Sequence, residues 1–235
     1  ELAKSVNAAI GRGGVILVPA FAVGRAQQLI YLLQVLIASE KIPSLPIYLD
    51  SPMSVKANQV YLQHCNEHDL IEAAAVASGV GLKARNVICT PTAEESKRIN
   101  HVQGPAVIIS SSGMMTGGRI LHHLRQRLPD SRNTVLLGGF QAIGTRGRQL
   151  QDGAKYIRIH GQDVPVRARV LGISGLSGHA GHCELIRWLQ PLAKPRRVFF
   201  THGEKTSAMS MADELHRTRG WETYVPRLHE SVEFS

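Results

Sequence analysis

The stretch Val15-Ile-Leu-Val-Pro-Ala-Phe-Ala-Val-Gly-Arg-Ala-Gln-Gln-Leu-Ile-Tyr-Leu-Leu-Gln-Val-Leu-Ile37 joins a short apolar run to a long helical pattern through a loop of small residues. The run at 15–18 is continuously apolar rather than alternating, which is typical of a strand buried on both faces of a parallel sheet. A buried strand, a loop and a helix in this order predict one unit of an α/β fold.

The same alternation continues along the chain. Helical patterns occupy 55–64, 118–128 and 208–217, and they alternate with short apolar runs at 46–49, 87–89, 107–109, 135–137, 156–159, 166–170, 198–200 and 223–225. We therefore expect an α/β fold with parallel strands. The polar stretch His160-Gly-Gln-Asp-Val164 is the expected boundary, which divides the chain into residues 1–160 and 161–235.

Composition limits the class of protein. The chain has 235 residues, of which 43% are hydrophobic, enough for one large or two small domains. Its apolar runs are shorter than the roughly 18 residues of a membrane span. Cys65, Cys89 and Cys183 are far apart, so we expect reduced thiols in a cytoplasmic protein rather than disulfides. The chain does not begin with methionine, and we expect it to be a piece of a longer protein.

Positive charge gathers in one part of the sequence. The net charge is +9, and residues 115–170 contain ten Lys or Arg against three Asp. Two interpretations stay open: a surface that binds a polyanion, and a solvated helix face. Aromatic residues make up only 5% of the chain, so a nucleic acid would be bound through its phosphates rather than by base stacking.

Two histidines are candidate site residues. His179 follows the apolar run 170–173 and His202 follows the run 198–200, with a helical pattern between them. We expect both to lie at one edge of a sheet, where histidine serves as a metal ligand or a proton carrier. His182 either caps the following helix or faces the site. The other histidines are not expected to bind metal: His64, His68, His101, His122, His123, His160, His216 and His229.

Three loops at expected strand ends suit an anion. Arg25 lies in the first turn of a helix, Ser110–Gly118 is rich in small and hydroxyl residues, and Thr145 and Arg146 lie between Gly144 and Gly147. The alternative for each loop is an ordinary turn. Asp50 also ends a strand, and we expect it to act as an N-cap or in a turn with Ser51-Pro52 rather than in catalysis.

The loops, taken in order, resemble one family. Over nearly its whole length the chain resembles the C-terminal part of a β-CASP nuclease of the metallo-β-lactamase superfamily. Five fragments match the family's signatures: Pro19-Ala-Phe-Ala-Val-Gly-Arg-Ala-Gln27, Ser110-Ser-Ser-Gly-Met114, Gly144-Thr145, the motif B segment Ser177-Gly-His179 and the motif C segment Thr201-His-Gly-Glu204.

The resemblance implies a fold and a chemistry. Residues 1–160 would form a Rossmann-like β-CASP domain, and residues 161–235 would return to an αββα metallo-β-lactamase domain. The parent enzyme would hold two zinc ions and hydrolyse RNA, with His202 as a zinc ligand and His179 as general acid or transition-state stabiliser. The residues lining the path of single-stranded RNA would be Arg25, Ser111, Ser112 and Gly113, and the basic loop adds Thr145 and Arg146.

One departure from the family is large. The upstream His-x-His-x-Asp-His segment that supplies most metal ligands in the family is absent. The most similar segment of this chain is His64-Cys-Asn-Glu-His68, which lacks that pattern. Since one histidine cannot hold a dinuclear site, we expect the isolated chain to bind zinc poorly and to be inactive. The alternatives are a non-catalytic RNA-binding or scaffold paralogue and an unrelated α/β enzyme. DNA stays open as a substrate, and the strand-like Val232-Glu-Phe234 suggests a homodimer.

Overall fold

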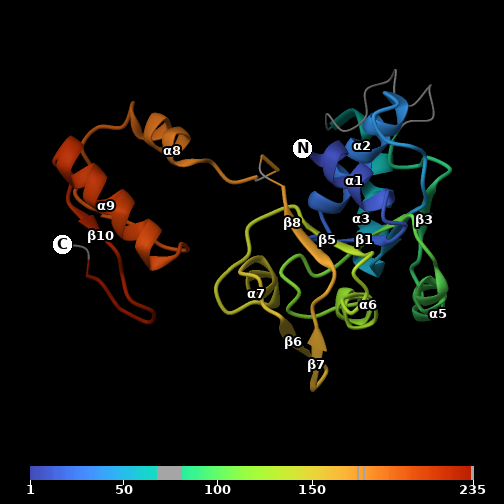
Figure 1. Ribbon diagram of the computed structural model, residues 1–235. Coiled ribbons are helices and arrows are strands. Elements are labelled where there is room, and N and C mark those ends of the chain that lie inside the picture. Colours follow the sequence, from blue (N-terminus) through green and yellow to red (C-terminus); the bar gives the residue numbers. More distant parts are fainter. Residues whose placement is uncertain (68–80, 174, 177, 234–235) are drawn as a thin grey trace. The chain divides into compact units, whose positions relative to one another are not determined.

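The computed structural model describes residues 1–67, 81–173, 175–176 and 178–233 (Figure 1). These residues form two compact units, Glu1–Ser177 and Gly178–Ser235, called unit 1 and unit 2 below. Each unit has its own sheet, so each is described by itself.

The centre of unit 1 is a six-stranded sheet in the order β3-β2-β4-β1-β5-β8, and every neighbouring pair is parallel. The parallel α/β fold expected from the sequence is confirmed. The strands are β1 (Val15–Pro19), β2 (Ile47–Asp50), β3 (Val87–Cys89), β4 (Ala106–Ser110), β5 (Thr134–Leu137) and β8 (Arg169–Gly172).

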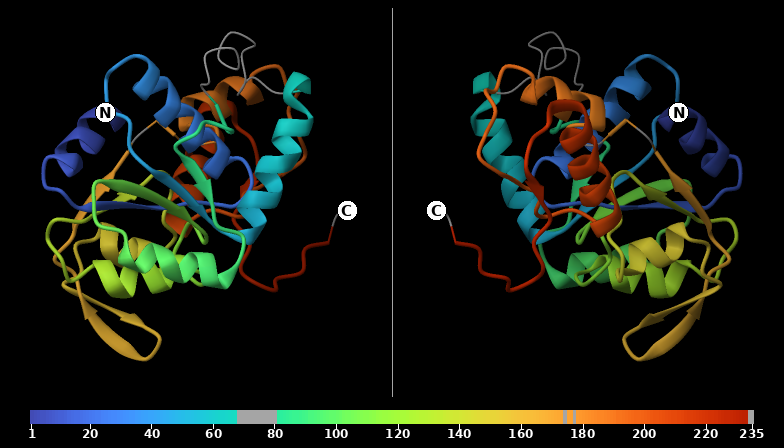
Figure 2. Two further views of the ribbon diagram at one scale, coloured as in Figure 1. Left: turned by 90° about the vertical axis from the view of Figure 1, so that its right-hand side faces the viewer. Right: turned by 90° about the vertical axis from the view of Figure 1, so that its left-hand side faces the viewer.

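Helices cover both faces of this sheet, as the left view of Figure 2 shows. One face carries α1 (Leu2–Ile10), α2 (Arg25–Ala38) and α3 (Pro52–Gln63), which ends close to the 3-10 turn η1 (Cys65–Glu67). The other face carries α5 (Ala93–Arg98), the 3-10 turn η2 (Ile99–His101), α6 (Ile120–Arg127), α7 (Arg146–Gln151) and an antiparallel hairpin of β6 (Tyr156–Ile159) and β7 (Gln162–Pro165).

The two-sided burial of β1 explains its continuous apolar sequence. Ile16 and Val18 pack into the apolar cluster under α1 and α2, whereas Val15 and Leu17 pack into the cluster under α6. All four side chains are almost completely buried. A strand with solvent on one face would alternate apolar and polar residues, so this run fixes β1 as an interior strand.

Unit 2 contains α8 (His182–Leu189), α9 (Lys205–Arg219) and a parallel pair of short strands, β9 (Val198–Phe199) and β10 (Thr223–Tyr224). Its buried side chains come mainly from α9 and the residue after its cap, and include Met211, Leu215 and Trp221. α9 ends at Gly220, whose φ of 61° is the left-handed conformation that glycine adopts readily.

The boundary between the two compact units lies after β8, which pairs with β5 over four residues. The expected division of the family domains at residue 160 stays a prediction. The strand before His179, β8, belongs to the six-stranded sheet, and the strand before His202, β9, pairs with β10. A shared edge for the two histidines stays a prediction. In the described part of the chain, the helices are too short or too polar to cross a membrane.

Replacing Ile108 by alanine tests the role of the central strands. Ile108 lies in β4 and is completely buried, so Ile108→Ala leaves a cavity and lowers the free energy of unfolding by about 3 kcal/mol. Ile88→Ala is the matched control, because Ile88 lies in the edge strand β3 and is 39% exposed. Urea denaturation of both variants makes the comparison, and equal losses would contradict the packing described here.

Candidate functional site

The carboxyl ends of the parallel strands meet at one edge of the unit 1 sheet, called the carboxyl edge below. Open α/β sheets bind ligands at this edge because the loops after neighbouring strands converge there. The loops that follow β1, β4 and β5 are the three that the sequence singles out. Their positions therefore decide whether those segments form one site.

The loop at 111–118 lies at the centre of this edge. The backbone N–H of Ala20, after β1, donates to the Ser110 carbonyl at 3.0 Å. From the loop after β5, Gln141 Nε2 donates to the Gly113 carbonyl at 3.2 Å. These bonds connect the three loops into one surface at the carboxyl edge.

Three predicted contact residues shape this surface in different ways. Ser111 Oγ lies 3.4 Å from Ser54 Oγ at the start of α3. Ser112 Oγ accepts a hydrogen bond from the Thr116 N–H at 3.1 Å and so closes the loop on itself. Gly113 leaves little room for a side chain, because a Cβ there would lie 3.1 Å from the ring and the backbone nitrogen of Phe21.

The remaining three predicted contacts are partly engaged within the protein. The guanidinium of Arg25, the first residue of α2, donates to Gln28, and burial lowers its pKa. Thr145 is the N-cap of α7. Arg146 donates from Nε to the Arg158 carbonyl at 2.6 Å and from Nη1 to the Met115 carbonyl at 3.2 Å. Phosphate contact by Thr145 and Arg146 stays a prediction.

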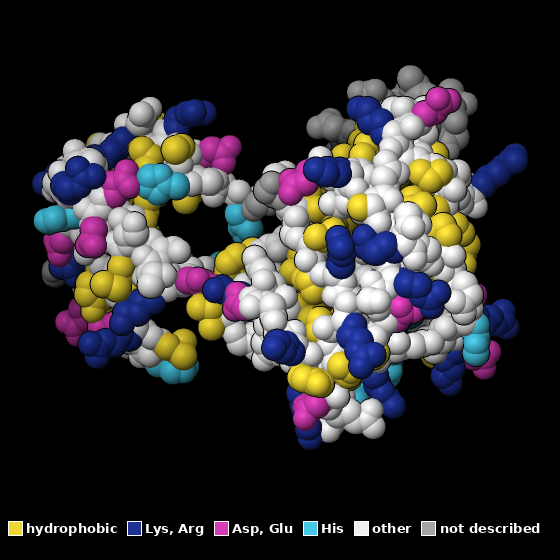
Figure 3. Space-filling view, in the orientation of Figure 1, with side chains coloured by type: hydrophobic (Ala, Val, Ile, Leu, Met, Phe, Trp, Pro, Cys, Tyr) yellow, Lys and Arg dark blue, Asp and Glu magenta, His cyan; other side chains and the backbone are white. Residues whose placement is uncertain are grey.

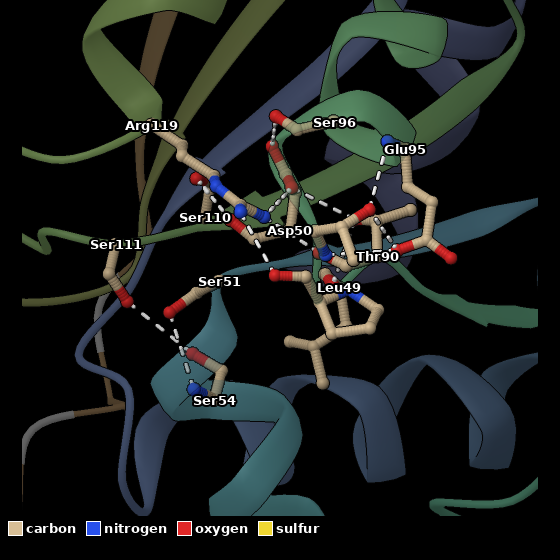
Figure 4. A network of polar contacts seen from close by, with 12 residues as sticks. Leu49, Asp50, Ser51, Ser54, Thr90, Glu95, Ser96, Ser110, Ser111 and Arg119 are labelled. Atoms are coloured by element: carbon tan, nitrogen blue, oxygen red, sulfur yellow. Dashed lines mark hydrogen bonds and ion pairs between the residues drawn. The ribbon is translucent and has the colours of Figure 1, made fainter.

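A buried carboxylate organises the same edge (Figure 4). Asp50 ends β2 with its side chain completely buried. Its Oδ1 accepts from Thr90 Oγ1 and from Arg119 Nη1, both at 2.9 Å. Its Oδ2 accepts from Ser96 Oγ at 2.7 Å and lies 2.6 Å from His123 Nε2. Four side chains from three surrounding segments thus converge on one residue.

The expected N-cap role of Asp50 is wrong, because Ser51 performs it. Ser51 Oγ accepts from the Ser54 N–H at 3.2 Å and caps α3. The sequence held a signal that two of the actual partners lie together, but none that they meet Asp50. Arg119 and His123 are four residues apart, a spacing that places two side chains on one face of a helix.

Burial alone would raise the pKa of Asp50, since it disfavours a charged carboxylate. The hydrogen bonds from His123, Ser96 and Thr90, with the charge of His123, outweigh that effect and hold the pKa of Asp50 below its usual value. The carboxylate is therefore ionised at neutral pH and holds its donors in fixed directions.

The basic segment at 115–170 is not a continuous free patch. Four of its arginines pair with carboxylates: Arg119 with Asp50, Arg132 with Asp130, Arg148 with Asp152 and Arg158 with Asp163. On the face drawn in Figure 3, Lys and Arg side chains are spread over unit 1 with apolar side chains between them. A polyanion surface stays a prediction, and its candidate place is the carboxyl edge.

Two exposed aromatic rings that were not among the predicted site residues lie beside the central loop. Phe21 is 53% exposed and lies against Gly113. Phe140 is 57% exposed and precedes Gln141, which donates to the Gly113 carbonyl. The low aromatic content of the whole chain argued against base stacking, but local placement matters more than the total.

The two candidate histidines belong to unit 2. His179 is exposed and lies in the loop before α8. His202 lies between β9 and α9 with a φ of 63°, and it lines a groove together with Met209, Tyr224 and His229. His182 begins α8, and its Nε2 lies 2.6 Å from Glu214 Oε2. His68 and Ser177, which the sequence analysis also named, are outside the described residues.

In the described part of the chain, the candidate metal ligands do not come together. Among the residues that the structure describes, no three His, Cys, Asp or Glu side chains come together in a way that could hold a metal ion. A zinc site with catalytic function needs at least three protein ligands. His202 and the residues around it therefore do not by themselves fit a zinc centre.

The fold and its edge define an α/β domain that presents three small-residue loops at the carboxyl ends of a parallel sheet. Residues 26–150 match the family model of the Beta-Casp domain. Residues 163–226 match a model described as a Zn-dependent metallo-hydrolase RNA specificity domain. The chain belongs to the β-CASP family.

Curated relatives match almost the whole chain. It is 35% identical over 235 residues to Ribonuclease TTHA0252 of Thermus thermophilus, covering 99% of this chain and 53% of that protein. It is 32% identical to the RNase J-like protein of Methanocaldococcus jannaschii, and the match covers 96% of this chain and 52% of that protein. It is 30% identical to transcription termination factor FttA of the same organism, and that match covers 96% of this chain and 37% of the factor. The chain thus spans about half or less of the length of these relatives.

The pH dependence of stability tests the ionised Asp50. With its pKa lowered in the folded state, Asp50 stabilises the protein fully above about pH 4, the unfolded value, and loses that contribution as the pH falls through the folded value. At pH 7, Asp50→Asn lowers the free energy of unfolding by about 3 kcal/mol, because it breaks a buried ionic network. We expect the difference in the free energy of unfolding between Asp50→Asn and the wild type to become smaller below pH 4.

Denaturation in urea between pH 2.5 and 7 measures this difference. Asp152→Asn is the control, since Asp152 is an exposed carboxylate that also pairs with an arginine. That variant should lose about 1 kcal/mol or less at pH 7. If the difference in the free energy of unfolding between wild type and Asp50→Asn stays constant down to pH 2.5, then Asp50 is not ionised in the folded protein.

Proposed function

We propose that this chain is part of a zinc-dependent ribonuclease that hydrolyses phosphodiester bonds of single-stranded RNA in the cytoplasm. The observation that carries the proposal is the meeting of three family-signature loops at the carboxyl edge, joined by hydrogen bonds to the Ser110 and Gly113 carbonyls. Relatives of this chain that are named as ribonucleases support the same conclusion.

The proposed RNA path follows the carboxyl edge. Ser111, Ser112 and Gly113 supply hydroxyl groups and closely approachable backbone, and Arg25 supplies positive charge, as phosphate contacts require. Thr145 and Arg146 extend the same surface from the loop before α7. Loops that carry such groups bind the phosphate backbone of RNA without contacting the bases, which suits a nuclease of broad sequence specificity.

The proposed roles in unit 2 belong to two histidines. His202 would be one zinc ligand, and His179 would give a proton to the departing oxygen or stabilise the charge that develops on it. Zinc would supply Lewis-acid chemistry at the phosphate. We propose that the other ligands come from a part of the polypeptide beyond these residues, and that the chain by itself is inactive.

A domain division accompanies this proposal. Residues 1–160 would be the β-CASP domain, and residues 161–235 the C-terminal part of a metallo-β-lactamase domain. The family models fall on either side of residue 160, which supports the division. A homodimer belongs to the same proposal. The strand expected at 232–234 does not support it, because Val232 and Glu233 lie outside the strands and Phe234 is outside the described residues.

A second candidate function is a non-catalytic RNA-binding scaffold with the same fold. The observation that favours it is the missing cluster of metal ligands among the described residues. In that case the carboxyl edge would still bind RNA. The unrelated α/β enzyme considered for the sequence is excluded by the family match.

Substituting the two histidines separates the two candidates. In the full-length protein, His202→Ala should lower zinc content and abolish RNA cleavage, whereas His179→Ala should abolish cleavage with zinc content retained. Removing a general acid typically costs about 100- to 10,000-fold in rate. Metal analysis and a labelled single-stranded RNA provide the two measurements.

His101→Ala is the control for this pair, because His101 is an exposed histidine of unit 1. It should leave zinc content and cleavage unchanged. A wild-type protein without zinc and without cleavage, but with RNA binding, would favour the scaffold. Full activity in His179→Ala would remove that residue from the mechanism.

The exposed ring of Phe21 allows a test of the RNA path. If an unpaired base stacks on it, Phe21→Leu should weaken binding of single-stranded RNA by roughly tenfold, and Phe21→Tyr should bind like the wild type. Tyr156→Leu is the control, since Tyr156 is 64% exposed on the β6–β7 hairpin. Fluorescence anisotropy gives the dissociation constants. A thermal destabilisation in Phe21→Leu with unchanged binding would instead identify Phe21 as a covered packing residue.

A further inference from the structure

The two residues that bound the loop at 111–118 are both fastened to Asp50. On the N-terminal side, Ser110 Oγ donates to the Asp50 carbonyl at 2.7 Å. On the C-terminal side, Arg119 Nη1 donates to Asp50 Oδ1 at 2.9 Å. One residue of a neighbouring strand therefore holds both ends of the loop that lies at the centre of the carboxyl edge.

Arg119 adds a second attachment that depends on the shape of its guanidinium. Besides Asp50, it donates from Nη1 to the Thr90 carbonyl at 2.7 Å and from Nη2 to the Pro91 carbonyl at 3.0 Å. The side chain is 20% exposed, so it reaches these acceptors at the surface of the edge. A planar fork reaches several acceptors in fixed directions, which the single ammonium of a lysine does not.

The loop itself is closed tightly between those ends. The Ser112 N–H donates to the Gly117 carbonyl, and the Ile120 N–H donates to the Ser111 carbonyl, both at 3.2 Å. Gly118 has a φ of 82°, and a Cβ there would lie 2.3 Å from the Ser111 oxygen. A closed loop of this kind moves as one piece, so its ends determine where its hydroxyl groups point.

We propose that Asp50 and Arg119 are positioning residues that hold the loop at 111–118 in its RNA-binding orientation. The proposal rests on the proposed function of that loop. Stability alone would not require an ionic network here, because an apolar pair of similar size avoids the cost of desolvating a carboxylate. What an apolar pair lacks is direction, and two of the directed bonds made by Asp50 end on the two residues that bound the loop.

Arg119→Lys tests the proposal with the positive charge retained. In the full-length protein we expect KM for single-stranded RNA to rise on the order of tenfold, the effect of losing about one charge-assisted hydrogen bond from the loop's attachment, while kcat changes less than twofold. Arg119→Met, which also removes the charge, should raise KM further. The matched control is Arg132→Lys, because Arg132 pairs with Asp130 through the same chemistry in an exposed turn.

Hydrogen exchange gives a readout that does not depend on RNA. In Arg119→Lys the amides of residues 111–118 should exchange at least several times faster, whereas those of β1 and β4 should be unchanged. Exchange in this loop that matches the wild type would overturn the proposal, and so would an equal rise of KM in Arg132→Lys. Faster exchange in a protein whose wild type neither binds nor cleaves RNA would keep the positioning role and overturn the proposed function instead.

Discussion

The arrangement of the candidate site depends on a single buried carboxylate. Asp50 ends β2, accepts hydrogen bonds from the residue after β3, from α5 and from the residue before α6, and receives the Ser110 hydroxyl on its own carbonyl. Parallel strands leave their carboxyl ends open, and the peptide groups and side chains there need partners once they are removed from water. Asp50 meets this need for three strand ends at once and aligns them with one another.

The sheet explains why such a residue can be buried there. β2 and β4 pair in parallel up to Asp50 and Ser110, so the two residues lie opposite each other at the end of the ladder. Apolar clusters on both faces exclude water from the strands behind them. The carboxylate is stable because its hydrogen bonds replace those that water would make, and the same exclusion of water makes those bonds strong.

Much of this fold could be predicted from the sequence, because the signals are local. The apolar run at 15–18 and the helical pattern after it identify β1 and α2, and the same reasoning locates the other strands of the sheet. The partners of Asp50 could not be predicted, since Thr90, Ser96 and Arg119 meet it only through the order in which β2, β3 and β4 lie side by side. The pairing of β8 with β5 was missed for the same reason: strand order depends on contacts between distant segments.

RNA binding and RNA cleavage, the two activities of the proposed ribonuclease, would make different demands on the polypeptide. The polar loops of unit 1 are complete within the described residues and are connected by hydrogen bonds to one another. A metal centre requires several ligands at once, and the described residues around His202 do not supply them. Since relatives are about twice as long as this chain, the parts that bind the backbone and the parts that complete the chemistry would be encoded in different stretches of one polypeptide. In the proposed ribonuclease, Asp50 would set the geometry of the carboxyl edge independently of the residues that hold the zinc.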